Sequence, residues 1–234
     1  MFHFKQFSVD QRGCAMKINT DGVLLGALVK ADNPTTILDI GTGTGVIALM
    51  LAQRFAGAKI DAVEIDETAA ETAVRNFNNS AFKERLTIYP KSFASFFERF
   101  AEKKFDLIVS NPPFHLHSLK SPGINKALAK HTDESFFEEL IAAIAQHLTD
   151  KGLCYLILPL KTAELVKVLV AQNKLYLHKL IKLHSYNDGE PHREILAIGM
   201  AQRGLSEEKF VIYNQPNKYS GEYSEVLKDF LTIF

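Results

Sequence analysis

From Thr35 onward, short apolar runs alternate with segments of helical periodicity. The apolar runs read TTILDI, KIDAVEI, RLTIYP, FDLIVS and GLCYLILP, and a segment with apolar residues at every third or fourth position follows each. Repeated strand-helix units predict a parallel sheet with helices on both faces. Two later runs, LHKLIKLHSY and REILAIGMA, are separated only by the turn-forming NDGEPH, which predicts an antiparallel edge strand.

This order predicts an α/β fold of the Rossmann-like type, with a mainly parallel, seven-stranded sheet. The 234 residues are 47% hydrophobic, enough for one sizeable domain. We expect a single domain over 1–234, in which residues 1–34 form an N-terminal segment and residues 35–234 form the core. The longest irregular piece, His115 to Thr132, is polar and basic, and such a loop is usually functional or mobile.

Composition limits the classes of partner. Lys plus Arg and Asp plus Glu both number 27, so a polyanion would have to bind a local basic patch. Cys14 and Cys154 stand far apart, which argues against a zinc site or a disulfide scaffold and favours a reducing cytoplasm. The N-terminus lacks the apolar core of a signal peptide, and no apolar run approaches membrane-spanning length. We expect a soluble, cytoplasmic protein without a metal ion.

A glycine-rich turn follows the first core strand. In LDIGTGTG, Gly41, Gly43 and Gly45 stand between this strand and a helix, where missing side chains let backbone amides approach a ligand. About 20 residues later, Glu64 in VEID ends the second strand, as does the acid that binds ribose hydroxyls in dinucleotide folds. The pattern predicts a cofactor that contains a nucleoside.

The acids beside the turn bear on which cofactor this is. An NAD enzyme places a pyrophosphate at the helix N-terminus, whereas S-adenosylmethionine brings a sulfonium and an ammonium group. Asp39, just before the glycines, suits the ammonium better than a phosphate. Asp39 could instead cap the turn, and Asp66 could be the N-cap of the next helix as readily as a cofactor contact.

The stretch SNPPFH follows the apolar run FDLIVS. Pro112 and Pro113 fix φ and lack a backbone donor, so they hold Asn111 in one extended turn where the strand ends. The turn is either a simple strand terminator or a rigid platform for chemistry.

Taken together and in this order, LDIGTGTGVIAL, VEID and SNPPF resemble the class I methyltransferases that use S-adenosylmethionine, over roughly Ile37 to Pro159. The resemblance implies methyl transfer to a planar amine nitrogen: the Asn111 side-chain oxygen and the Pro112 carbonyl accept the amine hydrogens, and Phe114 stacks on an extruded base. It implies the catalytic group Asn111, Pro112, Pro113 and Phe114. It also implies a cofactor group made of Asp39, Gly41, Thr42, Gly43, Gly45, Glu64, Ile65, Asp66, Ser92 and Phe93.

The N-terminal stretch FKQFSVDQRGCAMKINTDGVLLGA, Phe4 to Ala27, is similar to the opening of the bacterial tRNA1(Val) adenine-37 N6-methyltransferase family. The resemblance implies tRNA as the substrate and sets Lys17, Thr20 and Asp21 over the pocket, with Thr20 or Asp21 near the methionine end of the cofactor. Each residue also has a plain structural alternative: a turn at Asp21, a cap at Thr20 for a helix that begins at Val23, and a solvated surface position for Lys17.

On a neutral protein, tRNA must meet local cations. Phosphate contacts from lysine and arginine give salt-dependent affinity, while base discrimination stays in the pocket for the flipped base. The candidate substrate-binding residues are Lys17, His115, Lys120, Lys126, Lys130 and Arg193.

Other functions remain open at this level. The motif NPPF also resembles ribosomal RNA guanine-N2 enzymes, and related motifs act on DNA adenine or on a release-factor glutamine. Those enzymes typically carry an extra domain, whereas only about thirty residues precede the first core strand here. A non-catalytic nucleic-acid-binding module would be expected to lose Asn111 or the glycines, and an NAD oxidoreductase would leave NPPF unexplained. The assignment therefore depends on the site and not on the fold.

Overall fold

A computed structural model of the protein describes residues 1–14, 17–112 and 126–234, and for residues 126–133 it describes only the backbone. The strands are β1 (Phe2–His3), β2 (Ser8–Val9), β3 (Thr36–Ile40), β4 (Lys59–Glu64), β5 (Leu86–Pro90), β6 (Phe105–Ser110), β7 (Leu148–Leu158), β8 (Tyr176–Tyr186), β9 (Pro191–Gly199), β10 (Ser206–Gln215) and β11 (Lys218–Tyr219). The α-helices are α1 (Thr20–Leu28), α2 (Val46–Arg54), α3 (Glu67–Asn78), α4 (Phe93–Arg99), α5 (Lys126–His147), α6 (Leu160–Gln172) and α7 (Gly221–Leu227).

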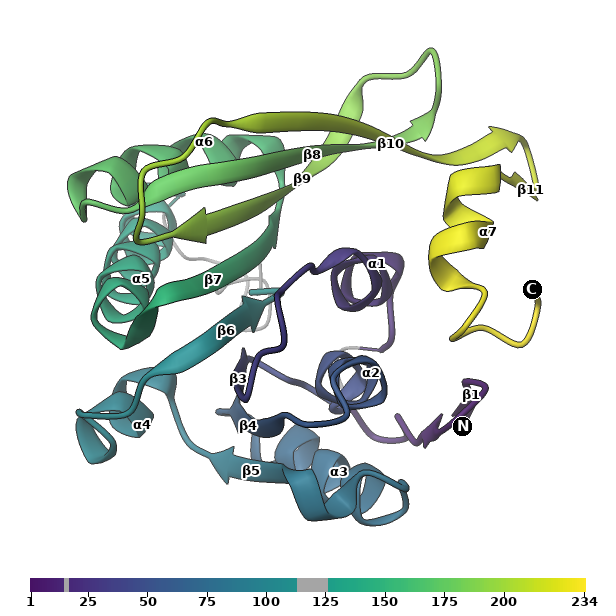
Figure 1. Ribbon diagram of the computed structural model, residues 1–234, viewed down its shortest axis with the longest axis horizontal. Helices are drawn as coiled ribbons and strands as arrows, with labels where there is room; N and C mark the ends of the chain where they lie inside the picture. The colour runs from purple at the N-terminus through teal and green to yellow at the C-terminus, as the bar shows by residue number, and fades with distance from the viewer. Residues whose placement is uncertain (15–16, 113–125) are drawn as a thin grey trace.

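The described residues form one large sheet of nine strands in the order β11-β10-β8-β9-β7-β6-β3-β4-β5 (Figure 1). Strands β5, β4, β3, β6 and β7 pair in parallel, which confirms the Rossmann-like fold expected from the alternating pattern. The antiparallel strand β9 is not at the edge as expected, because it lies between β7 and β8. Beyond β8 the sheet continues into the parallel strand β10 and the short strand β11.

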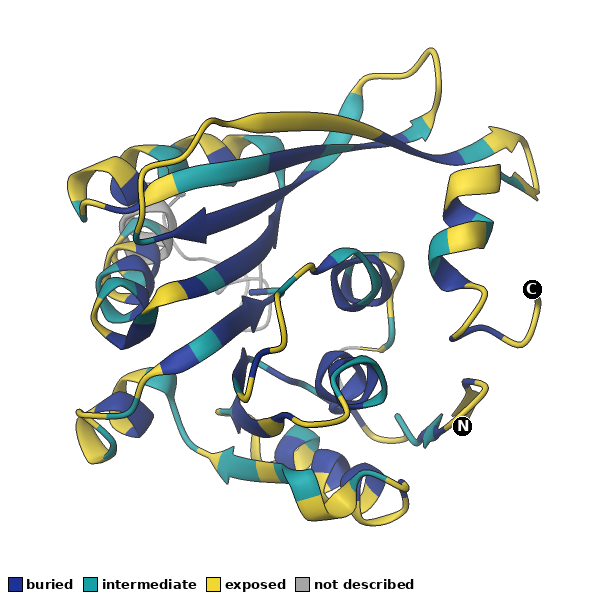
Figure 2. Ribbon diagram, viewed as in Figure 1, coloured by how far each residue is buried: buried dark blue, intermediate teal, exposed yellow. Residues whose placement is uncertain are grey.

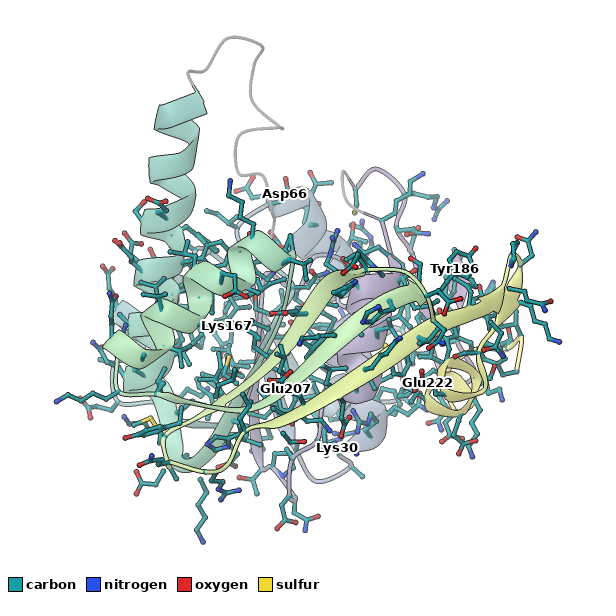
Figure 3. All side chains as sticks on the ribbon, turned by 90° about the horizontal axis from the view of Figure 1, so that it is seen from above. Lys30, Asp66, Lys167, Tyr186, Glu207 and Glu222 are labelled. Carbon is teal, nitrogen blue, oxygen red and sulfur yellow. The ribbon has the colours of Figure 1, made fainter. Side chains whose placement is uncertain are left out.

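The position of β9 has a simple cause. The turn between β8 and β9 is tight, so β9 must run back beside β8, and its other side completes the hydrogen bonding of β7. The chain then adds β10 on the free side of β8, which leaves β8 with a neighbour on each side. Figure 3 shows Tyr186 and Glu222 at the same end of this outer part of the sheet, where α7 lies.

Helices cover both faces of the sheet and create two apolar cores (Figures 1 and 2). Helices α1, α2, α3 and α7 lie on one face, and side chains such as Leu24, Leu49 and Leu227 are fully buried there. Helices α4, α5 and α6 lie on the other face, with Phe96, Ile141 and Val166 in the second core. The central strands β3, β4 and β6 are buried almost throughout, as their continuous apolar runs predict.

Two helices begin earlier than the sequence pattern suggested. Helix α5 begins at Lys126, so part of the expected loop from His115 to Thr132 is helical. Helix α1 begins at Thr20, and its N-cap is Asn19, whose side-chain oxygen accepts a hydrogen bond from the Gly22 nitrogen at 2.9 Å. No helix within the described ranges is long and apolar enough to cross a membrane.

Gly152 offers a test of the packing between β6 and β7. The pairing of these strands is irregular here, and a Cβ added at Gly152 would lie 2.8 Å from the carbonyl oxygen of Phe105 and 3.0 Å from backbone atoms of Thr149. We expect Gly152→Ala to lower the free energy of unfolding by about 2 kcal/mol, because backbone atoms cannot move aside as a flexible side chain can. The measurement is urea denaturation.

The matched control is Gly57→Ala, since a Cβ at Gly57 meets nothing within 4 Å. This substitution should leave stability unchanged or raise it slightly, because alanine restricts the unfolded chain. Equal stabilities for the two variants would contradict the crowding inferred at Gly152.

Candidate active site

The carboxyl ends of β3, β4 and β6 meet at one edge of the sheet. Ile40, the last residue of β3, pairs with Ser110 of β6 on one side and with Val63 of β4 on the other. The Ser110 hydroxyl also donates a hydrogen bond to the Ile40 carbonyl at 2.8 Å. The glycine turn, the acid after β4 and the Asn-Pro turn after β6 are therefore neighbours, as expected for the ligand edge of such a sheet.

The glycine turn is held in a conformation that suits glycine. Gly41, Gly43 and Gly45 have φ of 71°, 57° and 88°, where other residues are strained. A Cβ at Gly45 would also lie 2.4 Å from the Phe77 ring, so α2 and α3 can approach only because that position has no side chain. Positions 41 and 43 have nothing within 4 Å of an added Cβ, so the space above them is open for a ligand.

Asp39 organises this turn from below. Its Oδ2 accepts hydrogen bonds from the Thr42 hydroxyl at 2.6 Å and from the Ala48 nitrogen at 3.1 Å. The side chain is fully buried, and its Oδ1 has no partner within the described residues. Burial raises the pKa of Asp39 to about 7, although the hydrogen bonds from Thr42 and Ala48 act in the opposite direction. The turn-capping role is therefore real, and Oδ1 is the atom left to accept a hydrogen bond from a ligand.

Glu64 links β4 to the same turn. Its Oε2 accepts a hydrogen bond from the Gly43 nitrogen at 2.8 Å, and its Oε1 accepts one from the Asp66 nitrogen at 2.9 Å. Between these acids, Ile65 exposes 73% of its surface, which offers an apolar face at the ligand edge. Asp66 is the N-cap of α3, and its side chain accepts a hydrogen bond from the Ala69 nitrogen at 2.8 Å. The alternative of a helix N-cap is therefore confirmed for this residue.

Ser92 and Phe93 follow β5 along the same edge. Ser92 is the N-cap of α4, with its hydroxyl oxygen accepting from the Ser95 nitrogen at 3.1 Å. Phe93 is half-buried, and its ring packs edge-on against Phe136 of α5 with the centroids 5.5 Å apart. Both have structural partners, and their expected contact with an adenine stays a prediction.

Asn111 stands directly after β6 with its side-chain oxygen unused. The Oδ1 atom is buried and has no hydrogen-bond partner in the part of the chain that the structure describes. A buried carbonyl oxygen without a partner is costly, so this atom is a place for a donor from a ligand. Pro112 is buried beside it. Four other predicted positions, Pro113, Phe114, His115 and Lys120, lie outside the described residues, as do the side chains of Lys126 and Lys130.

The start of α1 lies against Asn111. A Cβ added at Gly22 would lie 3.4 Å from Asn19 Oδ1 and 3.6 Å from Asn111 Nδ2. The stretch from Asn19 to Gly22 thus reaches the ligand edge, and Lys17 and Thr20 are exposed. Asn19 was missed by sequence reasoning, although an asparagine before an apolar helix is a recognisable N-cap signal.

Arg193 at the start of β9 belongs to the same edge, but it is engaged inside the protein. Its Nε donates a hydrogen bond to Asp21 Oδ2 at 2.8 Å, and its Nη1 donates to the His192 carbonyl oxygen at 2.8 Å. Asp21 therefore pairs with Arg193 from within α1 instead of making a turn. The sequence analysis did not identify the neighbouring His192. Burial and the adjacent positive charge of Arg193 lower the pKa of this histidine.

These residues fit S-adenosylmethionine. The Asp39 oxygen that has no partner within the described residues suits an ammonium group, and Ile65 offers an apolar face for a base. The space above Gly41 and Gly43 is open, but the backbone amides of the turn donate inside the protein at residues 41, 42, 43 and 45, so the expected approach of these amides to a ligand is not seen. Glu64 keeps acceptor capacity for ribose hydroxyls because a carboxylate has more lone pairs than the two hydrogen bonds it accepts. Within the described ranges, no group of three or more His, Cys, Asp or Glu side chains could hold a metal ion.

The buried carboxyl group of Asp39 predicts a pH effect. Because its pKa rises from 3.8 to about 7 on folding, the folded protein retains a proton that the unfolded chain loses in this interval. Its contribution to stability is present below pH 4 and is lost as pH rises to about 7. The free energy of unfolding of the cofactor-free protein, measured in urea, should therefore fall by on the order of 3 kcal/mol relative to Asp39→Asn across this range.

A titration of the wild-type carboxyl carbon by NMR gives the same test without a substitution. A midpoint near pH 7 is expected, and a midpoint below 4 would show that the buried oxygen has a partner in solution.

Comparison with known proteins agrees with this geometry. The Methyltransferase small domain family matches residues 15–169. A protein of Pedobacter heparinus named tRNA1(Val) (adenine(37)-N6)-methyltransferase is 44% identical over 233 residues, covering 100% of this chain and 98% of its own. A protein of the same name from Flavobacterium psychrophilum is 42% identical, with 98% of each chain covered.

Solved structures show the same fold at low sequence identity. A predicted O-methyltransferase from Agrobacterium tumefaciens superposes with a TM-score of 0.70 at 18% identity, covering 90% of this chain and 96% of its own. TrmN from Thermus thermophilus has a TM-score of 0.56 at 19% identity, covering 76% of this chain and 46% of its own. The match along nearly the whole length of its curated relatives is decisive: this chain belongs to the Methyltransferase small domain family, among the proteins named tRNA1(Val) (adenine(37)-N6)-methyltransferase.

Proposed function

We propose that the protein transfers a methyl group from S-adenosylmethionine to the exocyclic N6 amine of adenine 37 in a valine tRNA. The observation that carries this proposal is the buried Oδ1 of Asn111, which has no hydrogen-bond partner within the described residues. Asn111 follows β6, the strand that pairs with β3 and so lies next to the glycine turn. The names of relatives that align along the whole chain support the substrate.

The cofactor is held by residues of the glycine turn and of the two acids beside it. Asp39 Oδ1 accepts from the ammonium group, Glu64 accepts from ribose hydroxyls, and Ile65 covers the adenine. When bound, S-adenosylmethionine supplies a methyl group that its positively charged sulfur activates for transfer. Asp66, Ser92, Phe93, Thr20 and Asp21 complete the proposed cofactor group, with Arg193 positioning Asp21 through their hydrogen bond.

The task of the protein is to orient a weak nucleophile. The lone pair of the adenine amine is delocalised into the ring, so the amine must be turned and held toward the methyl group. The Asn111 oxygen accepts one amine hydrogen, and the Pro112 carbonyl accepts the other. Because Pro112 is buried at the end of β6, the two acceptors are held by the sheet. Pro113 and Phe114 complete the motif, with Phe114 stacking on the flipped base.

Binding of tRNA to this neutral chain depends on local cations. Lys17 is exposed. In this proposal it contacts phosphate together with His115, Lys120, Lys126 and Lys130. Arg193 contributes by holding Asp21, and any direct contact with RNA must compete with that ion pair. The chain acts as one domain in the cytoplasm, and residues 1–34 form part of the pocket.

The test is methyl transfer with identification of the product. Purified protein is incubated with S-adenosylmethionine and unmodified valine tRNA, and the digested RNA is analysed by mass spectrometry. N6-methyladenosine is expected, and none should form on a transcript with guanine at position 37. Asn111→Ala should lower kcat about 100-fold, since a positioned acceptor at the reacting group is lost, with little change in the affinity for cofactor.

The matched control is Asn214→Ala, at an exposed asparagine in β10. It should retain full activity. Formation of N2-methylguanosine would contradict the adenine assignment, and transfer to protein but not to RNA would contradict the substrate class.

A further inference from the structure

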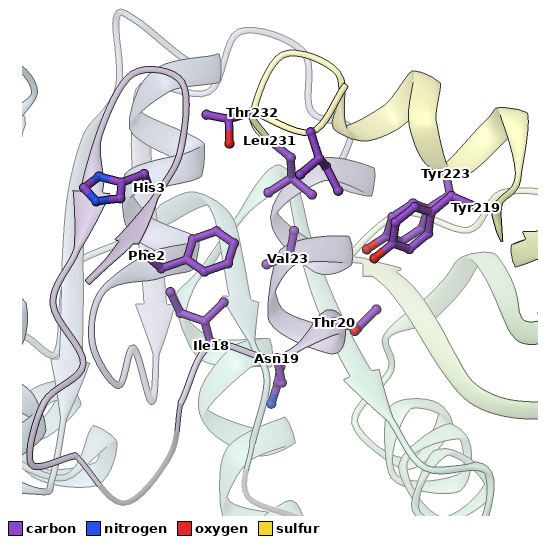
Figure 4. Close-up of a pocket in the computed structure, with 11 residues that line it drawn as sticks. Phe2, His3, Ile18, Asn19, Thr20, Val23, Tyr219, Tyr223, Leu231 and Thr232 are labelled. Atoms are coloured by element: carbon purple, nitrogen blue, oxygen red, sulfur yellow. The ribbon is translucent and has the colours of Figure 1, made fainter. Parts of the chain in front are cut away.

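A groove of about 310 Å³ lies between the N-terminal residues, the start of α1 and the C-terminal segment (Figure 4). Phe2 and Ile18 line one side, and Tyr219 and Tyr223 line the other, with Val23 between them. Leu231 and Thr232 lie above α1 in the same view. Thr20 of the proposed cofactor group also lines this space, whereas Asp39, Glu64 and Asn111 do not.

The walls of the groove are held in place before any ligand binds. The rings of Tyr219 and Tyr223 stack with centroids 4.6 Å apart and planes 9° apart. On the opposite side, Phe2 packs on Phe4 with the centroids 4.9 Å apart. The backbone nitrogen of Lys5 donates a hydrogen bond to the Phe230 carbonyl oxygen at 2.7 Å, which connects the N-terminal wall to the C-terminal segment. A preformed site loses little entropy when a ligand enters.

The lining offers the ring of Phe2 to a flat ligand with polar edges, because Tyr223 is only 5% exposed and Tyr219 stacks against both Tyr213 and Tyr223. Phe2 leaves 36% of its surface exposed and Ile233 leaves 64%, so apolar surface remains available. Asn19 uses its side-chain oxygen as the N-cap of α1, and within the described residues its amide nitrogen is left for an acceptor on a ligand. Aromatic surface with a few amide and hydroxyl groups is the composition that binds unstacked nucleobases.

The charges next to the groove favour an anionic chain. Lys17 and Lys218 are exposed and adjoin the lining residues Ile18 and Tyr219 in sequence. Two acids of this region are engaged inside the protein: Asp21 accepts from Arg193, and Glu222 accepts from the Val211 nitrogen at 2.6 Å. Single-stranded RNA is bound by cations that contact its phosphates together with rings that contact its bases, and Lys17 and Lys218 are the cations next to the lining residues in sequence.

The groove borders the candidate active site at Asn19. Asn19 lines the groove. A Cβ added at Gly22 would lie 3.4 Å from the Asn19 side-chain oxygen and 3.6 Å from the Asn111 amide nitrogen, so the two asparagines are close neighbours. We infer that the groove binds the base of a nucleotide that flanks the methylated adenosine in the RNA substrate. This inference rests on the proposed function and adds a second base-binding subsite to it.

The test uses stem-loop oligoribonucleotides that contain the target adenosine and an abasic nucleotide on its 5′ or its 3′ side. With wild-type protein, removal of the base that occupies the groove should raise KM for RNA about five- to tenfold, the loss expected for one base stacked on aromatic rings. With Phe2→Ala, KM for the intact RNA should rise similarly, and the same abasic nucleotide should have little further effect.

Two further variants separate binding from folding. Tyr176→Ala is the matched control. Tyr176 is an aromatic residue with 37% exposure, similar to Phe2, but it begins β8 and does not line the groove. It should leave KM unchanged. Ile233→Glu removes no buried group and places a carboxylate beside the RNA, so it should raise KM while the melting temperature stays constant. Calorimetry should give the same affinity for S-adenosylmethionine in all variants.

The outcomes distinguish this inference from the proposed function. Without methylation of any RNA by wild-type protein, both are wrong. The groove assignment alone is wrong if wild-type protein methylates the RNA but Phe2→Ala and Ile233→Glu, like Tyr176→Ala, leave KM for RNA unchanged. It is also wrong if each abasic nucleotide changes KM equally in wild type and in Phe2→Ala. A concentration-dependent dimer that Phe2→Ala dissociates would assign the groove to a second copy of the chain and overturn the inference.

Discussion

The hydrogen bonds of the buried Asp39 carboxylate are the interaction on which the ligand edge depends. A single oxygen of this side chain holds both the Thr42 hydroxyl inside the turn and the Ala48 nitrogen in the first turn of α2. The strand, the turn and the helix are therefore joined at one buried atom. Burial disfavours the charged form of this carboxyl group, which is why its pKa rises to about 7.

From that point the edge is assembled by short contacts between neighbouring strands. Glu64 reaches from β4 to the Gly43 nitrogen, and the Ser110 hydroxyl reaches from β6 to the Ile40 carbonyl oxygen. These contacts leave one oxygen of Asp39 and one of Asn111 without partners in the described residues. Two buried acceptors on adjacent strands fit a cofactor at one strand and a substrate amine at the next.

Helix α1 closes this edge from one side of the sheet. It packs tightly on α2, since a Cβ at Gly26 would lie only 2.9 Å from the Met50 sulfur. The Arg54 guanidinium holds the end of α1 by donating to the carbonyl oxygens of Gly26 at 2.8 Å and Val29 at 2.6 Å. The helix is thereby fixed with its N-terminus against Asn111, and the N-terminal segment contributes both to the ligand edge and to the groove behind it.

The sequence by itself determined the elements and the glycine turn, because strand and helix periodicities and the needs of left-handed backbone are local properties. The order β7-β9-β8, the extension by β10 and the early start of α5 depended on pairing and packing partners outside each segment. The same reason explains Arg193, whose partner Asp21 is 172 residues away along the chain. Only the tertiary structure decided that a predicted phosphate ligand is engaged in an ion pair and that the two ends of the chain form one aromatic groove, since long-range contacts leave no local pattern.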